Sequence, residues 1–128
     1  MPGFFRFWGP VLLYMGLIFW SSSRPRPEVV ATTPDYLLHG PAYFLLAVLA
    51  VRGFAKGLDA DPKALEIAGG VALAVLYGMS DEWHQLAVPG RDGSLRDVLL
   101  DAAGAVAGGA SIAAVGRFRK SSDEGRAR

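Results

Sequence analysis

The 128-residue sequence contains no cysteine, and charged residues make up only 20% of it. The absence of cysteine excludes disulfide scaffolds, thiolate zinc sites, iron–sulfur clusters and cysteine nucleophiles. Thirteen Lys and Arg residues against twelve Asp and Glu residues leave a formal net charge of +1, which gives no electrostatic footprint for nucleic acid. The length allows one domain. Because 52% of the residues are hydrophobic, the choice lies between a soluble helical domain and a small membrane protein.

The few charges are spaced so that four long stretches carry none. These stretches hold 17, 16, 14 and 15 residues and lie at 7–23, 36–51, 67–80 and 102–116. A helix needs about 20 residues to cross a hydrocarbon core, and charges at its ends can reach the interface. Extended into their flanks, the stretches predict membrane-spanning helices at residues 4–22, 36–55, 62–83 and 97–116. Asp61 as N-cap and Pro62 as first helical residue mark the expected start of the third helix.

The apolar segments lack the polar stripe of a soluble surface helix. IAGGVALAVLYG and AAGAVAGGASIAAVG are apolar or small on every face, and a chain this short cannot bury four helices fully. The predicted fold class is therefore all-α, a small integral membrane bundle of four transmembrane helices. As an alternative, residues 1–23 read as a cleaved signal peptide, because Arg6, an apolar run and SSS resemble its three regions, although no A-x-A site follows.

The basic residues predict the orientation of the bundle. With the N-terminus in the cytoplasm, nine Lys and Arg residues lie inside and four lie outside, which favours both termini on the cytoplasmic side. Residues 1–116 then form the transmembrane domain. Residues 117–128, RFRKSSDEGRAR, are predicted to form a basic, disordered cytoplasmic tail.

In this topology three helix ends with polar residues meet on the outer side of the membrane. The residues expected to converge there are Asp35, His39, Tyr43, Asp81, Glu82, His84, Gln85, Arg91, Arg96, Asp97 and Asp101. On the fourth helix Asp97 and Asp101 share one stripe with Gly104 and Gly108. The two glycines form a G-x-x-x-G pair, which lets another helix approach closely. The two acids are therefore expected on the packed face, not against lipid.

Each polar residue also has a purely structural interpretation. Ser94 and Asp97 have the spacing of a capping box, so that Asp97 would only cap the fourth helix. Asp81 and Glu82 lie at a helix C-terminus, where pairing with one of the two arginines of the following loop would account for them. A histidine on a membrane-spanning helix, such as His39, is more often a hydrogen-bonded core residue than a metal ligand. These readings and the functional ones stay open at the level of the sequence.

Three segments resemble the VanZ-like family of membrane proteins. Residues 80–109, SDEWHQLAVPGRDGSLRDVLLDAAGAVAGG, contain D-E-x-x-Q, P-G-R and D-x-x-x-x-x-x-G elements in the order that the family has. Residues 35–46, DYLLHGPAYFLL, resemble its D-x-x-x-H-x-x-x-Y segment, and IFWSS at 18–22 resembles the end of its first helix. The resemblance implies a small multi-span membrane protein and an association with low-level resistance to the glycopeptide teicoplanin. By position the family motif residues fall on Asp35, His39, Tyr43, Asp81, Glu82, His84, Gln85, Arg91, Asp97 and Gly104.

Two positions depart from the pattern of the family. Asp101 stands where Asn is expected in most relatives, which adds a buried acid and raises the chance of a bound ion. Gly40-Pro41 interrupts a segment that is usually continuous, which is expected to move the start of the second helix or to kink it.

Three function classes follow from these observations. The leading hypothesis is a protein of the bacterial cytoplasmic membrane, without established catalysis or known cofactor, whose outward polar cluster affects cell-envelope chemistry or glycopeptide susceptibility. Its partners would be the lipid bilayer and a glycopeptide antibiotic or a lipid-linked wall precursor. The second is a membrane-embedded hydrolase or transferase, in which Asp81, Glu82, Asp97 and Asp101 bind a divalent cation and His84 or His39 moves protons, with Arg91 beside them. The third is a structural or regulatory protein that assembles with another membrane protein through its glycine seams.

Overall fold

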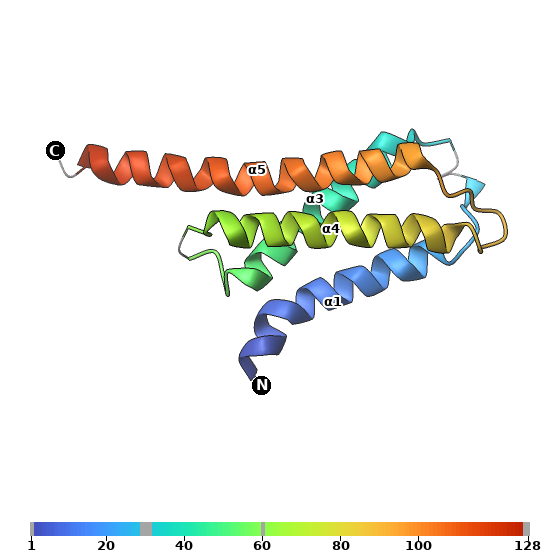
Figure 1. Cartoon of the computed structure of the whole chain (residues 1–128), viewed down its shortest axis with the longest axis horizontal. Coiled ribbons are helices and arrows are strands. Elements are labelled where there is room, and N and C mark those ends of the chain that lie inside the picture. Colours follow the sequence, from blue (N-terminus) through green and yellow to red (C-terminus); the bar gives the residue numbers. More distant parts are fainter. Residues whose placement is uncertain (1, 29–31, 60, 127–128) are drawn as a thin grey trace.

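Four long helices make up most of the computed structural model, which describes residues 2–28, 32–59 and 61–126 (Figure 1). The helices are α1 (Pro2–Ser22), α3 (Asp35–Phe54), α4 (Ala64–Gln85) and α5 (Leu95–Arg126). All four are long and apolar enough to cross a membrane. The prediction of an all-α fold with four membrane-spanning helices is thereby confirmed.

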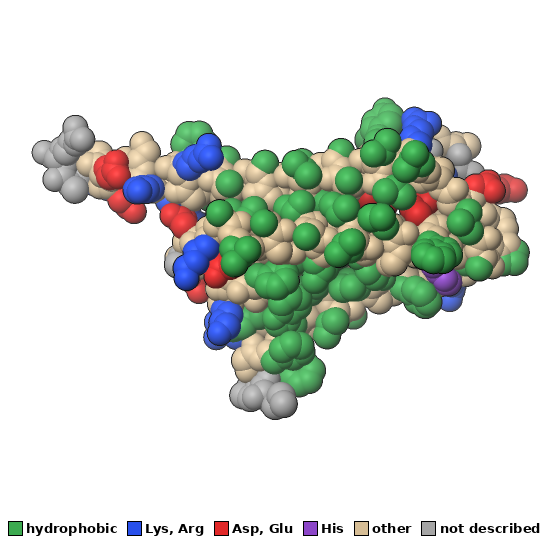
Figure 2. Space-filling model, in the orientation of Figure 1, with side chains coloured by type: hydrophobic (Ala, Val, Ile, Leu, Met, Phe, Trp, Pro, Cys, Tyr) green, Lys and Arg blue, Asp and Glu red, His purple; other side chains and the backbone are tan. Residues whose placement is uncertain are grey.

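The outer surface of the bundle is that of a membrane protein. Large apolar side chains such as Leu13, Leu76 and Leu99 are more than 60% exposed. Figure 2 shows hydrophobic side chains over the middle of the visible face and charged side chains towards its two ends. An apolar surface of this extent matches lipid tails in place of water. The chain is therefore a multi-pass membrane protein.

Helices α3 and α4 each pack against all three other helices, and α3 is the centre of the bundle because its contacts with them are the most extensive. Its buried residues Tyr43, Leu46 and Ala47 form the core together with Val11 of α1, Ala74 of α4 and Ala105 of α5. Helix α1 packs against α3 and α4 at its inner face. The three helices α3, α4 and α5 thus form the main body, and α1 adds to one side of it.

Glycines bring α5 close to α3. A Cβ atom at Gly104 would overlap the carbonyl oxygen of Gly40, and one at Gly108 would lie 2.5 Å from the carbonyl oxygen of Phe44. No side chain fits between backbones at this separation, so glycine is required at both positions. The G-x-x-x-G pair therefore packs within the chain, and its surface is not open to another protein.

The start of α4 differs from the prediction. The helix begins at Ala64, so Asp61 and Pro62 are neither its N-cap nor its first residue. The backbone amide of Lys63 instead donates to Oε2 of Glu66 over 2.7 Å. A carboxylate inside the first turn satisfies the free amide at the helix start, which leaves no such role for Asp61.

The expectation of a disordered tail is wrong for residues 117–126, because α5 continues as a helix through Arg126. Adding residues to an existing helix needs no new nucleus, and Arg, Lys and Glu are good helix formers. Arg119 and Asp123, and Lys120 and Glu124, are also spaced by four residues, which places opposite charges on one face. Residues 127 and 128 lie outside the described part of the chain.

The Gly40-Pro41 interruption does not displace the start of its helix. Helix α3 begins at Asp35, and Pro41 lies within it. The carbonyl of Gly40 is the group against which Gly104 packs. The departure from the family pattern thus lies at a close backbone contact between α3 and α5.

Candidate functional site

Polar side chains gather where four helix ends meet. Helices α1 and α4 end at Ser22 and Gln85, and α3 and α5 begin at Asp35 and Leu95, all at the same end of the bundle (Figure 1). Among the described residues, the buried polar and charged side chains all lie here, and we call them the polar cluster: Ser22, His39, Asp81, Glu82, Gln85, Asp97 and Asp101.

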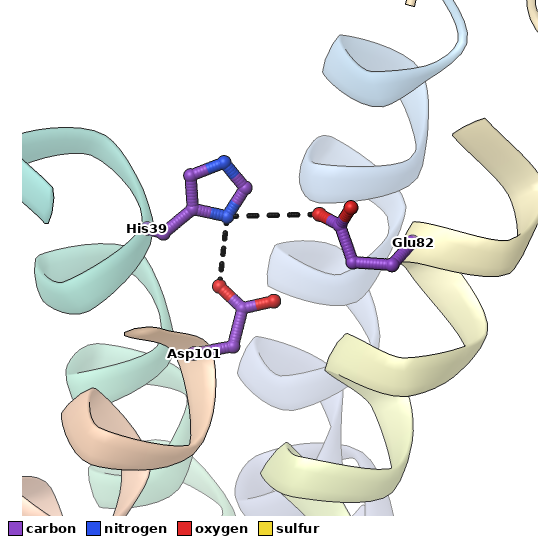
Figure 3. Close-up of side chains that lie close together, drawn as sticks. All are labelled: His39, Glu82 and Asp101. Atoms are coloured by element: carbon purple, nitrogen blue, oxygen red, sulfur yellow. Dashed lines mark hydrogen bonds and ion pairs between the residues drawn. The ribbon is translucent and has the colours of Figure 1, made fainter. Parts of the chain in front are cut away.

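The imidazole of His39 lies among carboxyl groups from two other helices (Figure 3). Its Nδ1 lies 2.8 Å from Oδ1 of Asp101 and 3.8 Å from Oε1 of Glu82. Its Nε2, on the other side of the ring, lies 3.8 Å from Oδ2 of Asp97. All four residues are buried. One residue of α3 therefore joins acids of α4 and α5.

Asp81 belongs to a separate part of the polar cluster, next to α1. Its Oδ1 accepts a hydrogen bond from the Ser22 hydroxyl over 2.5 Å, and its Oδ2 accepts from Nε2 of Gln85 over 3.1 Å and from the Tyr43 hydroxyl over 3.4 Å. These donors satisfy the carboxylate without an arginine. Ser22 was not among the predicted site residues, and the IFWSS segment is the signal that contained it.

The capping box predicted for Ser94 and Asp97 is only half formed. The amide of Asp97 donates to the Ser94 hydroxyl over 3.0 Å, but the amide of Ser94 donates to Oε2 of Glu82 over 3.0 Å. Glu82 therefore takes the hydrogen bond that the Asp97 carboxylate would accept in a full box. Oδ1 of Asp97 is buried and has no hydrogen-bond partner. Capping is thus not the role of the Asp97 carboxylate.

The predicted pairing of Asp81 and Glu82 with a loop arginine is not found. Among the described residues, no ion pair joins Arg91 or Arg96 to these acids, because Ser22, Gln85 and the Ser94 amide already occupy them. Arg96 is exposed.

Arg91 remains close to the acids without contacting them. Its Nε is buried and has no hydrogen-bond partner. Burial and the positive charge of Arg26 lower the pKa of Arg91, whereas the charges of Asp81, Glu82 and Asp97 act in the opposite direction. An arginine keeps its charge under these conditions. Its guanidinium is thus a cation that forms no ion pair with these acids in the described part of the chain.

Of the predicted residues, His84 points away from the acids, and the position of the Asp35 side chain is not described. His84 faces α1, where its Nε2 lies 3.0 Å from the Ser23 hydroxyl and its ring stacks on Phe19 with centroids 4.7 Å apart. Asp35 is the first residue of α3, and its side chain lies outside the described part of the chain. A proton-transfer role beside the acids is therefore open to His39 and not to His84.

A cavity of about 290 Å³ opens beside the polar cluster. Leu17 and Ile18 of α1 and Leu38 of α3 form its apolar wall. The polar wall contains His39, Asp81, Gln85 and Arg91. A cavity with one apolar and one polar wall suits an amphiphilic ligand.

Comparison with known proteins identifies the family of the chain. The VanZ/LLP1 family profile matches residues 35–116, which is more than half of the sequence. The chain belongs to the VanZ/LLP1 family. Neither a curated protein nor a solved structure matches the sequence.

The VanZ/LLP1 region contains α3, α4 and the membrane-spanning part of α5. It therefore includes His39, Glu82, Asp97 and Asp101. Helix α1 lies before the VanZ/LLP1 match, although Ser22 at its end donates to Asp81. The acids and the histidine thus come from the family region, and the apolar wall of the cavity comes partly from outside it.

Proposed function

We propose that this protein binds a lipid-linked cell-wall precursor at the outer surface of the bacterial cytoplasmic membrane and thereby lowers susceptibility to glycopeptides. The cavity beside the polar cluster is the binding site, with the lipid chain on its apolar wall and the anionic head group at Arg91. No covalent step is part of this proposal.

The observation that carries the proposal is the buried, unpartnered Nε of Arg91 beside an apolar wall. A buried donor without a partner costs free energy, which a phosphate oxygen would recover. Leu17, Ile18 and Leu38 offer the apolar surface that a lipid chain needs. The acids of the polar cluster accept hydrogen bonds from neighbouring donors, so Arg91 is not neutralised by direct contact with them.

The orientation of the bundle supports an extracytoplasmic ligand. Among the described residues, eight Lys and Arg residues belong to the end opposite the polar cluster and four belong to the end with the polar cluster. The positive-inside rule assigns the richer end to the cytoplasm. The cavity then opens at the outer leaflet, where both glycopeptides and exported wall precursors are found.

Replacing Arg91 tests this function. We expect Arg91→Gln to weaken binding of a polyprenyl diphosphate to the purified protein in nanodiscs about tenfold or more, because a charge-assisted hydrogen bond contributes about 1.5–3 kcal/mol. In bacteria that express the protein, the same substitution should abolish protection against teicoplanin. The dissociation constant and the minimal inhibitory concentration are the two measurements.

Arg24→Gln is the matched control. Arg24 lies at the same end of the bundle, is exposed and stacks on Trp20 at 3.9 Å from the ring centroid. The Arg24→Gln substitution removes one positive charge without changing a residue of the cavity wall, so lipid binding and protection against teicoplanin should persist. Equal binding by Arg91→Gln and the unchanged protein would contradict the proposed site. Binding that depends on Arg91 without any effect on protection would contradict the link to glycopeptides.

A further inference from the structure

The three residues His39, Glu82 and Asp101 have the arrangement of metal ligands. Each offers one ligand atom, and these atoms all lie within 4.8 Å of one another (Figure 3). They come from α3, α4 and α5, and all three are buried. We propose that His39, Glu82 and Asp101 bind a divalent first-row transition metal ion such as Zn²⁺ or Mn²⁺.

The spacing of the ligand atoms fits such an ion. Ligand atoms of a tetrahedral site with bonds of roughly 2.1 Å lie about 3.4 Å apart. The distances from His39 Nδ1 to Asp101 Oδ1 and to Glu82 Oε1 are 2.8 and 3.8 Å, on either side of this value. The 2.8 Å contact is a hydrogen bond between His39 and Asp101, so the ion takes the place of its proton, and side-chain rotations bring the three ligand atoms, now within 4.8 Å of one another, to one ion.

Asp97 supplies the second, independent observation. A histidine that binds a metal through one ring nitrogen usually donates its other N–H to a carboxylate, which fixes its orientation. Oδ2 of Asp97 lies 3.8 Å from His39 Nε2, on the side of the ring opposite Nδ1. The Oδ1 atom of Asp97 and the Oδ2 atom of Asp101 are both buried without a hydrogen-bond partner. The 3.8 Å separation is longer than a hydrogen bond, so a small rotation of the Asp97 side chain is needed for its carboxylate to accept from Nε2 and act as the positioning residue of His39.

The balance of charge at this end of the bundle favours a cation. Asp81, Glu82, Asp97 and Asp101 are buried, and the ion pairs given for them in the described part of the chain are those of His39 with Glu82, Asp97 and Asp101. Buried carboxylates are costly unless they are paired or coordinate a metal. A divalent ion compensates two of the negative charges at the point where three of the four acids surround His39.

The ligand types select the class of metal. An imidazole nitrogen with two carboxylates suits borderline transition metals, whereas Mg²⁺ and Ca²⁺ prefer oxygen ligands alone. Asp81 is not a ligand, because Ser22, Gln85 and Tyr43 donate to its two oxygens. His39 replaces Asp81 in the set that the sequence suggested, and Asp97 moves from a ligand to a positioning residue.

Metal binding is tested directly on the purified full-length protein, without lipid substrate. The protein is treated with chelator, incubated with Zn²⁺, Mn²⁺ or Mg²⁺ and desalted, and the retained metal is measured by mass spectrometry. We expect about one equivalent of Zn²⁺ or Mn²⁺, a rise in Tm on its addition and no retained Mg²⁺. Asp101→Asn and His39→Gln should lose both the retained ion and the rise in Tm.

Asp92→Asn is the matched control, because Asp92 is an exposed acid of the loop between α4 and α5. Asp92→Asn should bind the metal ion as tightly as the unchanged protein does. Asp97→Asn should keep the site and lower its affinity by about 10- to 100-fold, since only the positioning of His39 is lost. If His39→Gln and Asp101→Asn do not fold, as judged by helical circular dichroism, the affinity of Asp97→Asn for the metal ion tests the proposal.

The proposal is overturned if the unchanged protein retains no transition metal, if Asp101→Asn and Asp97→Asn both bind as tightly as it does, or if Asp92→Asn loses the ion as well. Equal retention of Mg²⁺ would overturn the assignment to a transition metal. The metal assay contains no polyprenyl diphosphate, so a protein that binds no metal does not contradict the proposed function at Arg91. In the same way, a protein that binds no polyprenyl diphosphate does not contradict the metal site.

Discussion

At the scale of single residues, the polar cluster is held together by a small number of uncharged donors. Ser22, Gln85 and the amide of Ser94 each donate to a buried carboxylate. These groups carry no charge, so they satisfy the acids without neutralising them. Arg91 and Arg96 form no ion pair with these acids in the described part of the chain, which leaves room for the cation that we propose at His39, Glu82 and Asp101.

Removal of one such donor should destabilise the bundle. Ser22→Ala leaves Oδ1 of Asp81 without the hydroxyl that lies 2.5 Å from it. A buried acceptor that loses its donor costs about 1–3 kcal/mol, and we expect the free energy of unfolding to fall by that amount. Titration with denaturing detergent, followed by circular dichroism, measures the change.

Ser21→Ala is the control for this substitution, because Ser21 is exposed and adjacent in the chain. It should leave the free energy of unfolding unchanged to within about 0.5 kcal/mol. If Ser22→Ala behaves like Ser21→Ala, the bond from α1 to Asp81 contributes nothing to stability.

At the scale of helices, the sequence predicted the elements well because their signal is local. Charge-free stretches longer than most soluble strands or loops indicate spanning helices whatever their partners are. The errors fall at the ends, at Ala64 and beyond Gly116. Helix ends depend on which group satisfies the last free amides and carbonyls, and apolar periodicity does not contain that information.

The packing of α5 on α3 depends on glycine in a way that substitution can measure. Gly104→Ala places a Cβ against the backbone oxygen of Gly40, which cannot rotate away. We expect a loss of about 1–3 kcal/mol in the free energy of unfolding, the usual cost of overpacking. The same detergent titration gives the value.

Gly16→Ala provides the comparison within a spanning helix, since a Cβ at Gly16 meets nothing within 4 Å. It should unfold like the unchanged protein. A Gly104→Ala variant that is as stable as Gly16→Ala would show that α3 and α5 can separate without cost.

At the scale of the whole molecule, part of the site was predictable and part was not. The stripe of Asp97, Asp101, Gly104 and Gly108 predicted which face of α5 is packed, and the order of the helices predicted which ends meet. Contacts between helices were not predictable, because pairing depends on the rotation and depth of each helix, which periodicity does not fix. For this reason Ser22 was missed and Arg91 was paired wrongly with the acids.

The orientation in the membrane is open to a clean test because the chain has no cysteine. Single cysteines at the exposed positions Asp92 and Asp123 mark the two ends of the bundle. We expect a membrane-impermeant maleimide to label Asp92→Cys in intact cells and Asp123→Cys only after permeabilisation, as the distribution of Lys and Arg requires. The reverse pattern would put the polar cluster on the cytoplasmic side.

The glycine contact between α3 and α5 also limits what a single copy can transport. Beyond the polar cluster, Ala47, Ala50 and Ala105 are completely buried, and Gly108 packs against the backbone of Phe44. This layer is tightly packed in the described part of the chain. An ion or head group that enters beside Arg91 therefore finds no path along this layer towards the other end of the bundle.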